Sequence, residues 1–314
     1  MSTPTPTADQ TRFGILCAVA AQLCWGFFPL YVYFLKSIDS FSLVAHRAIW
    51  SLALLAGVLF FARNSNHFAL PKIQEFKLAI RDGPTLRMFA LAAVLIGINW
   101  IGFVWAVTHD RALDASLGYY ICPQVVVLLG VVFQNERLRV VQWIAVGLAS
   151  FGVAYMGRSA TGIPWLAIAI ALSFGFYGLV KKRVAQTALT GLTLETGFLF
   201  IPALIFLGYQ STQSDGSVFG SDWLVNVFLI GSGLATVTPL ALYATALKHI
   251  PLSTSGLLQF MGPTIQFFVG VFIFSEQFDH SRLIGFLFVW TGVALYLFAM
   301  RRTQLEQNEH DTTA

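Results

Sequence analysis

The sequence reads Leu23-Cys-Trp-Gly-Phe-Phe-Pro-Leu30 near its start and Leu172-Ser-Phe-Gly-Phe-Tyr-Gly-Leu179 near its middle. The two stretches share their end leucines and a Gly-Phe pair flanked by aromatic residues. A further match holds one offset of 140 residues, and it pairs Pro123, Gly130 and Glu136 with Pro263, Gly270 and Glu276. Apolar composition alone does not keep a proline, a glycine and a glutamate in register. The chain therefore contains an internal repeat.

The composition of the chain is that of a membrane protein. Charged residues make up 11% and hydrophobic residues 56% of its 314 residues, whereas soluble proteins carry roughly 25% charged residues. So few charges cannot cover the surface of a globule in water. This excludes a soluble enzyme, a nucleic-acid-binding protein and a disordered protein.

A transmembrane helix needs about 20 mainly apolar residues to cross the hydrocarbon layer. Ten segments meet this requirement, at residues 13–35, 41–62, 86–107, 113–134, 140–157, 163–180, 190–209, 223–247, 252–274 and 282–300. They form two repeats, residues 13–157 and 163–300, with five spans each. Because five is odd, the second repeat enters the bilayer upside down relative to the first. The predicted fold is an all-α integral membrane protein of ten transmembrane helices in two inverted-topology repeats, which is typical of secondary transporters.

The longest connection between spans contains a helix of another kind. At about residues 71–83, the apolar Ile73, Phe76 and Ile80 recur on one face, and charged side chains mark the other face. This pattern predicts an amphipathic helix that lies on the membrane surface.

The basic residues indicate the orientation of the chain. Of the 19 Lys and Arg residues, fourteen lie in or beside the two chain ends and the loops after spans 2, 4, 6 and 8, and four lie in or beside the other loops. Positive residues are retained on the cytoplasmic side of a membrane. We therefore predict that residues 1–12 and 301–314 are short, disordered cytoplasmic tails.

Motifs spread over most of the spans point to one family. They are Trp25-Gly26, His46-Arg47, Trp50-Ser51, Asn99-Trp100, Leu113-Asp-Ala-Ser-Leu-Gly-Tyr119, Ser173-Phe-Gly-Phe-Tyr-Gly-Leu179, Glu195-Thr196, Pro239-Leu240, Gln259 and Pro263-Thr264. With these residues, the chain resembles RarD-type permeases of the drug/metabolite transporter superfamily, which consist of two EamA domains. The resemblance implies a ten-helix fold, export or exchange of small metabolites, and a bacterial cytoplasmic (inner) membrane location. One departure is Cys122-Pro123-Gln124, where such permeases usually carry Asn-Pro.

Two adjacent ionisable residues, His46 and Arg47, lie about seven residues into span 2. A charged side chain at this depth is costly unless it faces a cavity or a partner. We therefore predict that both belong to the transport pathway. Alternatively, Arg47 reaches the outer headgroups with its long side chain, and His46 is a neutral core histidine that bonds a backbone carbonyl.

Glu195 lies about five residues into span 7, and that span holds no basic residue. Desolvation favours the neutral form of a buried carboxylate, so we predict that Glu195 couples transport to protons or gates the pathway. The repeat aligns Glu195 with His46, so we predict that His46 is the proton-coupling counterpart of Glu195 in the first repeat. This alignment predicts two gates at opposite depths rather than one ion pair. The alternative is a glutamate at the cytoplasmic interface, paired with Lys181, Lys182 or Arg183.

Polar and aromatic residues of several spans are predicted to line a solute cavity. They are Trp25, Asn99, Trp100, Tyr119, Tyr120, Gln259 and Gln266. Pro123 and Pro263 are predicted to break their helices, because a proline frees a backbone carbonyl that must face protein or a watery cavity. The alternative for all these residues is packing and hydrogen bonding between helices. Glu136 and Glu276 are expected to be interfacial turn residues.

Together, these features favour a secondary transporter of small metabolites or drug-like amphiphiles that works by alternating access. It is either coupled to protons or an uncoupled facilitator or exchanger of amino-acid-like solutes. A polytopic membrane enzyme is a remote alternative, since the sequence has no H-E-x-x-H, no G-x-S-x-G and no Walker A loop. The expected partners are a small-molecule solute, membrane lipid and, in the coupled case, protons. No cofactor, metal or nucleic acid is expected.

Overall fold

A computed structural model describes residues 7–62, 73–108, 112–158, 165–213, 219–220, 222–275 and 280–313, and the regular elements of this part of the chain are all helical. The helices are α1 (Ala8–Tyr33), α2 (Ser40–Ala62), α3 (Ile73–Arg81), α4 (Gly83–Thr108), α5 (Ala112–Gln134), α6 (Val140–Gly157), α7 (Trp165–Arg183), α8 (Ala188–Ser211), α9 (Trp223–His249), α10 (Leu252–Leu258), α11 (Met261–Phe272) and α12 (His280–Thr313).

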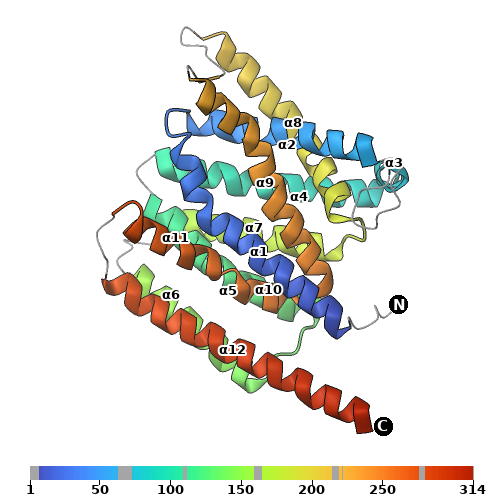
Figure 1. The fold of residues 1–314 in the computed structure, drawn as a ribbon, viewed down its shortest axis with the longest axis vertical. Helices are drawn as coiled ribbons and strands as arrows, with labels where there is room; N and C mark the ends of the chain where they lie inside the picture. The colour runs from blue at the N-terminus through green and yellow to red at the C-terminus, as the bar shows by residue number, and fades with distance from the viewer. Residues whose placement is uncertain are drawn as a thin grey trace.

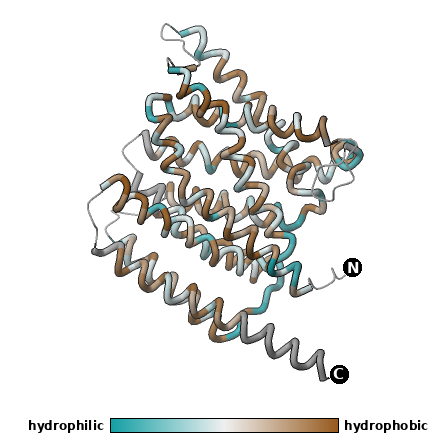
Figure 2. Tube along the Cα trace, viewed as in Figure 1, coloured by the Kyte–Doolittle hydropathy of each residue, from teal (hydrophilic) through white to brown (hydrophobic). Residues whose placement is uncertain are grey.

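Ten stretches of this described chain are long and apolar enough to cross a membrane. Nine of them lie in single helices, and the tenth, Leu252–Phe272, comprises α10 and α11 together. Figure 2 shows hydrophobic residues along the helices and hydrophilic residues mainly near their ends and on α3. The predicted all-helical fold with ten spans is confirmed.

The two halves of the chain interlock through reciprocal contacts. The helix α1 packs on α9 as its counterpart α7 packs on α4, and α2 packs on α9 as α8 packs on α4. Three further contacts join a helix to its own counterpart: α2 with α8, α5 with α10, and α6 with α12. In Figure 1, the α2–α8 pair and the α6–α12 pair lie on opposite sides of the bundle. A pseudo-twofold axis between two inverted repeats requires this reciprocity.

The helices α6 and α12 approach each other backbone to backbone. A Cβ atom added to Gly152 would lie 2.5 Å from the carbonyl oxygen of Gly285, and one added to Gly292 would lie 2.5 Å from that of Ala145. Only glycine permits this approach, which is common where helices pack within membranes.

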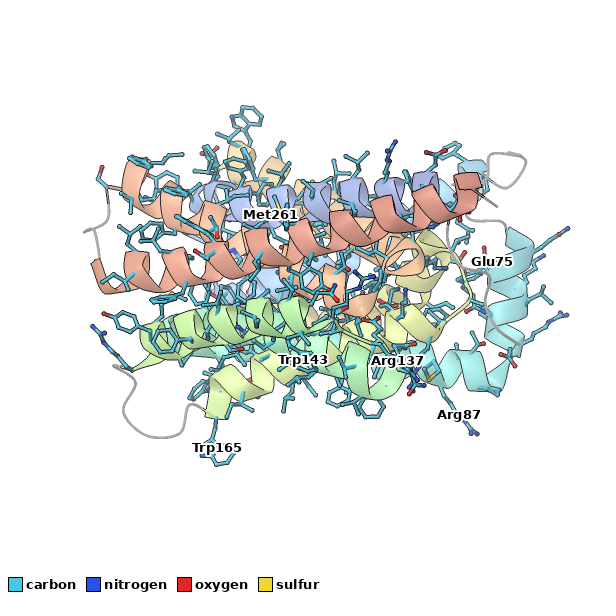
Figure 3. All side chains as sticks on the ribbon, turned by 90° about the horizontal axis from the view of Figure 1, so that it is seen from below. Glu75, Arg87, Arg137, Trp143, Trp165 and Met261 are labelled. Atoms are coloured by element: carbon cyan, nitrogen blue, oxygen red, sulfur yellow. The ribbon has the colours of Figure 1, made fainter. Side chains whose placement is uncertain are left out.

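The bundle has two ends, which we call the terminal end, where α1 begins and α12 finishes, and the distal end, where α2 begins and α11 finishes. Figure 1 shows the start of α1, the end of α12 and α3 on the same side of the bundle. In Figure 3, Glu75, Arg87 and Arg137 lie toward one end, and Trp165 lies at the other. The labelled arginines thus lie toward the terminal end, as expected if this end faces the cytoplasm.

The surface segment at about residues 71–83 contains α3. Phe76 and Ala79 pack in a cluster with Phe89 of α4 and Leu194 of α8. Ile80, which was expected on the same apolar face, is 46% exposed. Glu75 accepts hydrogen bonds from the backbone N–H and hydroxyl of Thr187, the N-cap residue of α8. This helix is therefore fixed to α4 and α8.

Parts of both predicted tails are helical. The helix α1 begins at Ala8 because Thr7 and Gln10 form a capping box, in which each side chain accepts a hydrogen bond from the other residue's backbone N–H, at 3.3 and 3.0 Å. The helix α12 continues past residue 300 to Thr313, through a segment that holds no glycine or proline. Residues such as Gln and Glu favour helix. The prediction of disordered tails is wrong for these residues.

Candidate functional site

A cavity of about 730 Å³ lies between the two repeats. Its walls come from α1, α2, α4 and α5 of the first repeat and from α7, α9 and α11 of the second. Small-molecule sites commonly have volumes of about 300–1,000 Å³. The cavity therefore has room for one metabolite-sized solute.

The cavity extends from the middle of the bundle to the distal end. Along α1 it follows Gln22 to Tyr33 and continues to the exposed Lys36. Along α11 it runs from Pro263 to Phe274, just beyond the helix. None of the described residues that precede Gln22 contributes to it. In this structure, a solute can therefore reach the site from the distal end.

Eight of the ten predicted transport residues line this cavity. They are Trp25, Arg47, Asn99, Trp100, Tyr119, Tyr120, Gln259 and Gln266. Pro263, one of the two predicted helix-break residues, also lines it. The two predicted proton-coupling residues, His46 and Glu195, lie outside it.

Arg47 extends from α2 into the wall of the cavity. Its Nε–H donates to the Oγ1 atom of Thr236 in α9, at 2.9 Å. Its guanidinium carbon lies 4.5 Å from the ring centroid of Trp100 and 5.2 Å from that of Phe28. Both rings are close enough for cation–π attraction, so they and the hydroxyl fix the guanidinium in place.

Asn99 connects three helices in the cavity wall. Its Nδ2 group donates to the carbonyl oxygen of Ile170 at 3.0 Å and to the Oγ atom of Ser173 at 3.4 Å, both in α7. The hydroxyl of Tyr119 in α5 donates to its Oδ1 atom at 3.4 Å. A buried amide with these partners positions α4, α5 and α7 relative to one another.

Aromatic rings close the cavity toward the terminal end. Trp25 packs edge-on against Phe174 and Tyr243, with ring centroids 5.7 Å apart in both cases. Phe174 also contacts Tyr177, with ring centroids 5.8 Å apart. Gln259 donates from Nε2 to the hydroxyl of Tyr243 at 3.2 Å. We call Trp25, Phe174, Tyr177 and Tyr243 the aromatic floor.

Glu195 lies beneath the aromatic floor in a buried ion pair. Lys181 Nζ donates to Glu195 Oε1 at 2.6 Å, and each side chain is 2% exposed. The Tyr177 hydroxyl donates to Glu195 Oε2 at 3.1 Å. The pairing of Glu195 with Lys181, which is the alternative given in the sequence analysis, is therefore present in the structure. Through Tyr177, Glu195 contacts the floor of the cavity without lining it.

His46 is buried near the distal end of α2. The indole N–H of Trp50 donates to the Nδ1 atom of His46 at 3.2 Å. The ring centroids of His46 and Phe219 lie 5.1 Å apart. A nitrogen that accepts a hydrogen bond carries no proton. Glu195 lies early in α8, which begins at the terminal end. The two residues are therefore near opposite ends of the bundle.

Of the two prolines predicted to break their helices, Pro263 follows a break and Pro123 does not. The second-repeat span is divided at Gln259–Phe260, between α10 and α11, because the ring of Pro263 clashes with the carbonyl four residues earlier. The helix α5, in contrast, continues through Pro123, so the break predicted there is wrong. Packing supports α5 at this point, since a Cβ atom added to Gly256 of α10 would lie 2.8 Å from the Pro123 carbonyl oxygen.

Side chains at the terminal end connect the two repeats. Glu136, which follows α5, accepts hydrogen bonds from the backbone N–H groups of Leu252 and Ser253 at the start of α10, at 2.5 and 2.9 Å. A terminal guanidinium nitrogen of Arg183 in α7 donates to the carbonyl oxygen of Phe133 in α5, at 3.1 Å. This end is therefore closed by contacts between repeats. Glu136 is more than a turn residue, because it caps a helix of the opposite repeat.

Sequence reasoning did not identify several residues of the cavity, among them Gln22, Phe28, Lys36 and Phe174. Phe28 and Phe174 belong to the two matching stretches that reveal the repeat, and this was a usable signal. In the described ranges, no group of three or more His, Cys, Asp or Glu residues is arranged to hold a metal ion.

Comparisons with known proteins agree with the duplicated architecture. A family model described as the EamA-like transporter family matches residues 12–158 and again residues 161–298. The two matches coincide with the two repeats.

Several bacterial proteins are similar over almost their full length. The uncharacterized transporter YojE of Bacillus subtilis (strain 168) is 38% identical over 307 residues, which cover 96% of this chain and 99% of that protein. Protein RarD of Escherichia coli (strain K12) is 35% identical over 300 residues, which cover 94% and 99%. A solved crystal structure superposes with a TM-score of 0.68 at 18% identity and covers 92% of this chain and 98% of that chain. This last likeness concerns the fold alone.

Proposed function

The chain belongs to the EamA-like transporter family, and from this premise we propose that it is a secondary transporter of small metabolites or drug-like amphiphiles. Membership of the family makes the chain a membrane transporter and not an enzyme. Its bacterial relatives and its basic terminal end support a location in the bacterial cytoplasmic (inner) membrane, with both termini in the cytoplasm.

The observation that carries the proposal is the cavity between the repeats, which reaches the distal end and is closed toward the terminal end by the aromatic floor. Two inverted repeats can exchange their conformations, and this exchange opens the opposite end around the same central site. Contacts such as Glu136 with α10 then form and separate in each cycle. Solute transport by alternating access follows from this symmetry.

The cavity wall supports a role for the predicted lining residues in binding the solute. Trp25, Trp100 and Tyr120 offer ring surfaces, while Gln259 and Gln266 offer amides. A small site with many rings and few polar groups suits a compact, partly apolar solute. Amphiphilic metabolites meet this description.

Coupling to protons would act through Glu195. A proton and the Lys181 ammonium compete for the same carboxylate, because protonation removes the charge that holds the ion pair of 2.6 Å. Loss of this pair would also alter the hydrogen bond from Tyr177 and, through it, the aromatic floor. His46 occupies the equivalent position in the first repeat. The second candidate is an uncoupled facilitator, in which the ion pair is permanent and only holds α7 against α8.

The direct test is a metabolite-library screen for uptake and efflux with the purified protein in proteoliposomes. We expect a subset of small amphiphilic compounds to cross only in protein-containing vesicles, with saturation and with counterflow exchange. An imposed pH gradient separates the two candidates, because only a proton-coupled transporter accumulates its solute against a gradient. If no compound crosses faster than in empty liposomes, transport through this cavity is refuted.

A further inference from the structure

Two cationic side chains line the cavity, and none of its described lining residues is a carboxylate. Arg47 lies in its wall and Lys36 at its distal mouth, and the other lining side chains are apolar or neutral polar. Glu195 is outside the cavity and is paired with Lys181. The described part of the site therefore carries net positive charge.

Arg47 is held in place but is not neutralised. Its Nε–H donates to a neutral hydroxyl, that of Thr236, and its guanidinium faces the rings of Trp100 and Phe28. None of these groups is an anion. Within the described residues, no acceptor binds its terminal nitrogens. A guanidinium presents its donors as a planar fork that matches a carboxylate, and this fork remains available to a solute.

The unpaired charge determines which solutes the site favours. A cation at membrane depth is costly, and ring faces offset only part of that cost. A bound anion removes the cost, whereas a bound cation adds repulsion in a medium of low dielectric constant. Lys36, whose ammonium lies 4.8 Å from the ring centroid of Tyr33, extends the positive field to the mouth and attracts anions toward it.

The surfaces beside Arg47 indicate the rest of the solute. The Trp100 ring that contacts Arg47 also faces the cavity, and Trp25 and Phe174 lie at the cavity's closed side. We propose that the solute is an organic monocarboxylate with an aromatic or apolar body, which binds its carboxylate to Arg47 and packs its body against Trp100 and the aromatic floor. This inference rests on the proposed function, because it names the solute class of the same cavity.

The test compares three probes that share one ring system and differ in charge: indole-3-propionate, its neutral amide, and the cation tryptamine. Phenylpropionate and octanoate extend the carboxylate set to other bodies. Binding to the purified full-length protein is measured by isothermal titration calorimetry. We expect a carboxylate to bind on the order of tenfold to a hundredfold more tightly than the amide, as a charge-assisted pair provides, and tryptamine to bind more weakly still.

Arg47→Gln should remove the preference for the carboxylate over the amide, and Arg47→Lys should keep part of it. Arg87→Gln is the matched control, because it removes a basic residue toward the terminal end, away from the cavity (Figure 3). Thermal unfolding of each variant checks that it is folded. Equal binding of carboxylate and amide by the wild type overturns the inference, as does a preference that survives Arg47→Gln or a lack of binding by every carboxylate.

These binding measurements do not depend on transport. Selective carboxylate binding without movement of any compound in proteoliposomes would refute the proposed function and leave the anion site standing. Transport of neutral or cationic solutes alone would refute the anion site and leave the transporter standing.

Discussion

In the buried ion pair between Lys181 and Glu195, each charge offsets the desolvation cost of the other. Removing one member of a buried pair costs about 3–5 kcal/mol, because the other charge stays uncompensated. Glu195→Gln should therefore lower the thermal stability in detergent, and adding Lys181→Met should restore part of it. Additive losses would mean that the two side chains are not coupled.

The same Glu195→Gln variant tests coupling. If a proton exchanges with Lys181 at this carboxylate, the variant should lose solute accumulation driven by a pH gradient and retain counterflow exchange, since the glutamine keeps the shape of the side chain and cannot titrate. The measurement is uptake into proteoliposomes with and without the gradient. Accumulation at the wild-type rate would assign Glu195 a structural role and favour uncoupled facilitation.

The cavity rings should contribute to affinity. Trp100→Ala and Tyr120→Ala should each weaken apparent binding of the transported solute by about fivefold to tenfold, since truncation of a ring removes contact area and any stacking, worth on the order of 1 kcal/mol or more. Trp165→Ala is the control, because Trp165 is 69% exposed at the distal end of α7. Concentration dependence of transport gives the affinities. Unchanged values in both cavity variants would remove these residues from the binding site.

The sequence predicted individual cavity residues better than it predicted their partners. Asn99, Trp100 and Gln259 were predictable because a polar or amphipathic side chain within a membrane span requires a specific environment. Lys181 was one of three basic residues near the end of its span, and periodicity does not reveal which of them turns toward Glu195. The choice depends on how α7 packs on its neighbours, which is a tertiary property.

The packing of α6 on α12 depends on glycine at two crossing points. Gly152→Ala and Gly292→Ala should each destabilise the protein by about 1–3 kcal/mol, because the added methyl group overpacks a backbone contact. Gly147→Ala is the matched control on α6, since its added Cβ would have no heavy atom within 4 Å. Thermal unfolding in detergent compares the three variants. Equal stability of all three would mean that α6 and α12 do not touch as described.

The cap that Glu136 forms on α10 should help to keep the terminal end closed. Glu136→Gln removes a charge that accepts two backbone N–H groups and should cost on the order of 1 kcal/mol. In a variant whose other cysteines are replaced by alanine, Cys122 should then react faster with a membrane-impermeant maleimide applied from the terminal side. Glu75→Gln, which weakens a cap on α8 instead, should leave that rate unchanged. Equal rates in the wild type and the Glu136 variant would contradict a closing role for this cap.

The existence and order of the spans were predictable because the thickness of the bilayer fixes the apolar length of each helix. That the ninth span is interrupted was predictable, since Pro263 lacks an N–H group and clashes with the preceding turn. The continuity of α5 through Pro123 was not predictable, because it depends on α10 packing at Gly256. A helix that breaks and one that does not can carry the same proline.

For the whole molecule, the inverted repeats predict both orientation and motion. Single cysteines at Lys77, in α3, and at Thr212, just after α8, should react with a membrane-impermeant maleimide from opposite sides, with Lys77→Cys labelled in inside-out vesicles. Reaction of both from one side would refute the orientation.

A third cysteine, Val32→Cys, reports on the cavity, which Val32 lines in its distal half. Without solute it should react from the Thr212 side, because the terminal end is closed by the aromatic floor and by Glu136. During solute exchange this reaction should slow, because the exchange of conformations between the repeats closes the distal end for part of each cycle. A rate that is the same with and without exchange would mean that this end stays open, and the protein would then act as a channel rather than by alternating access.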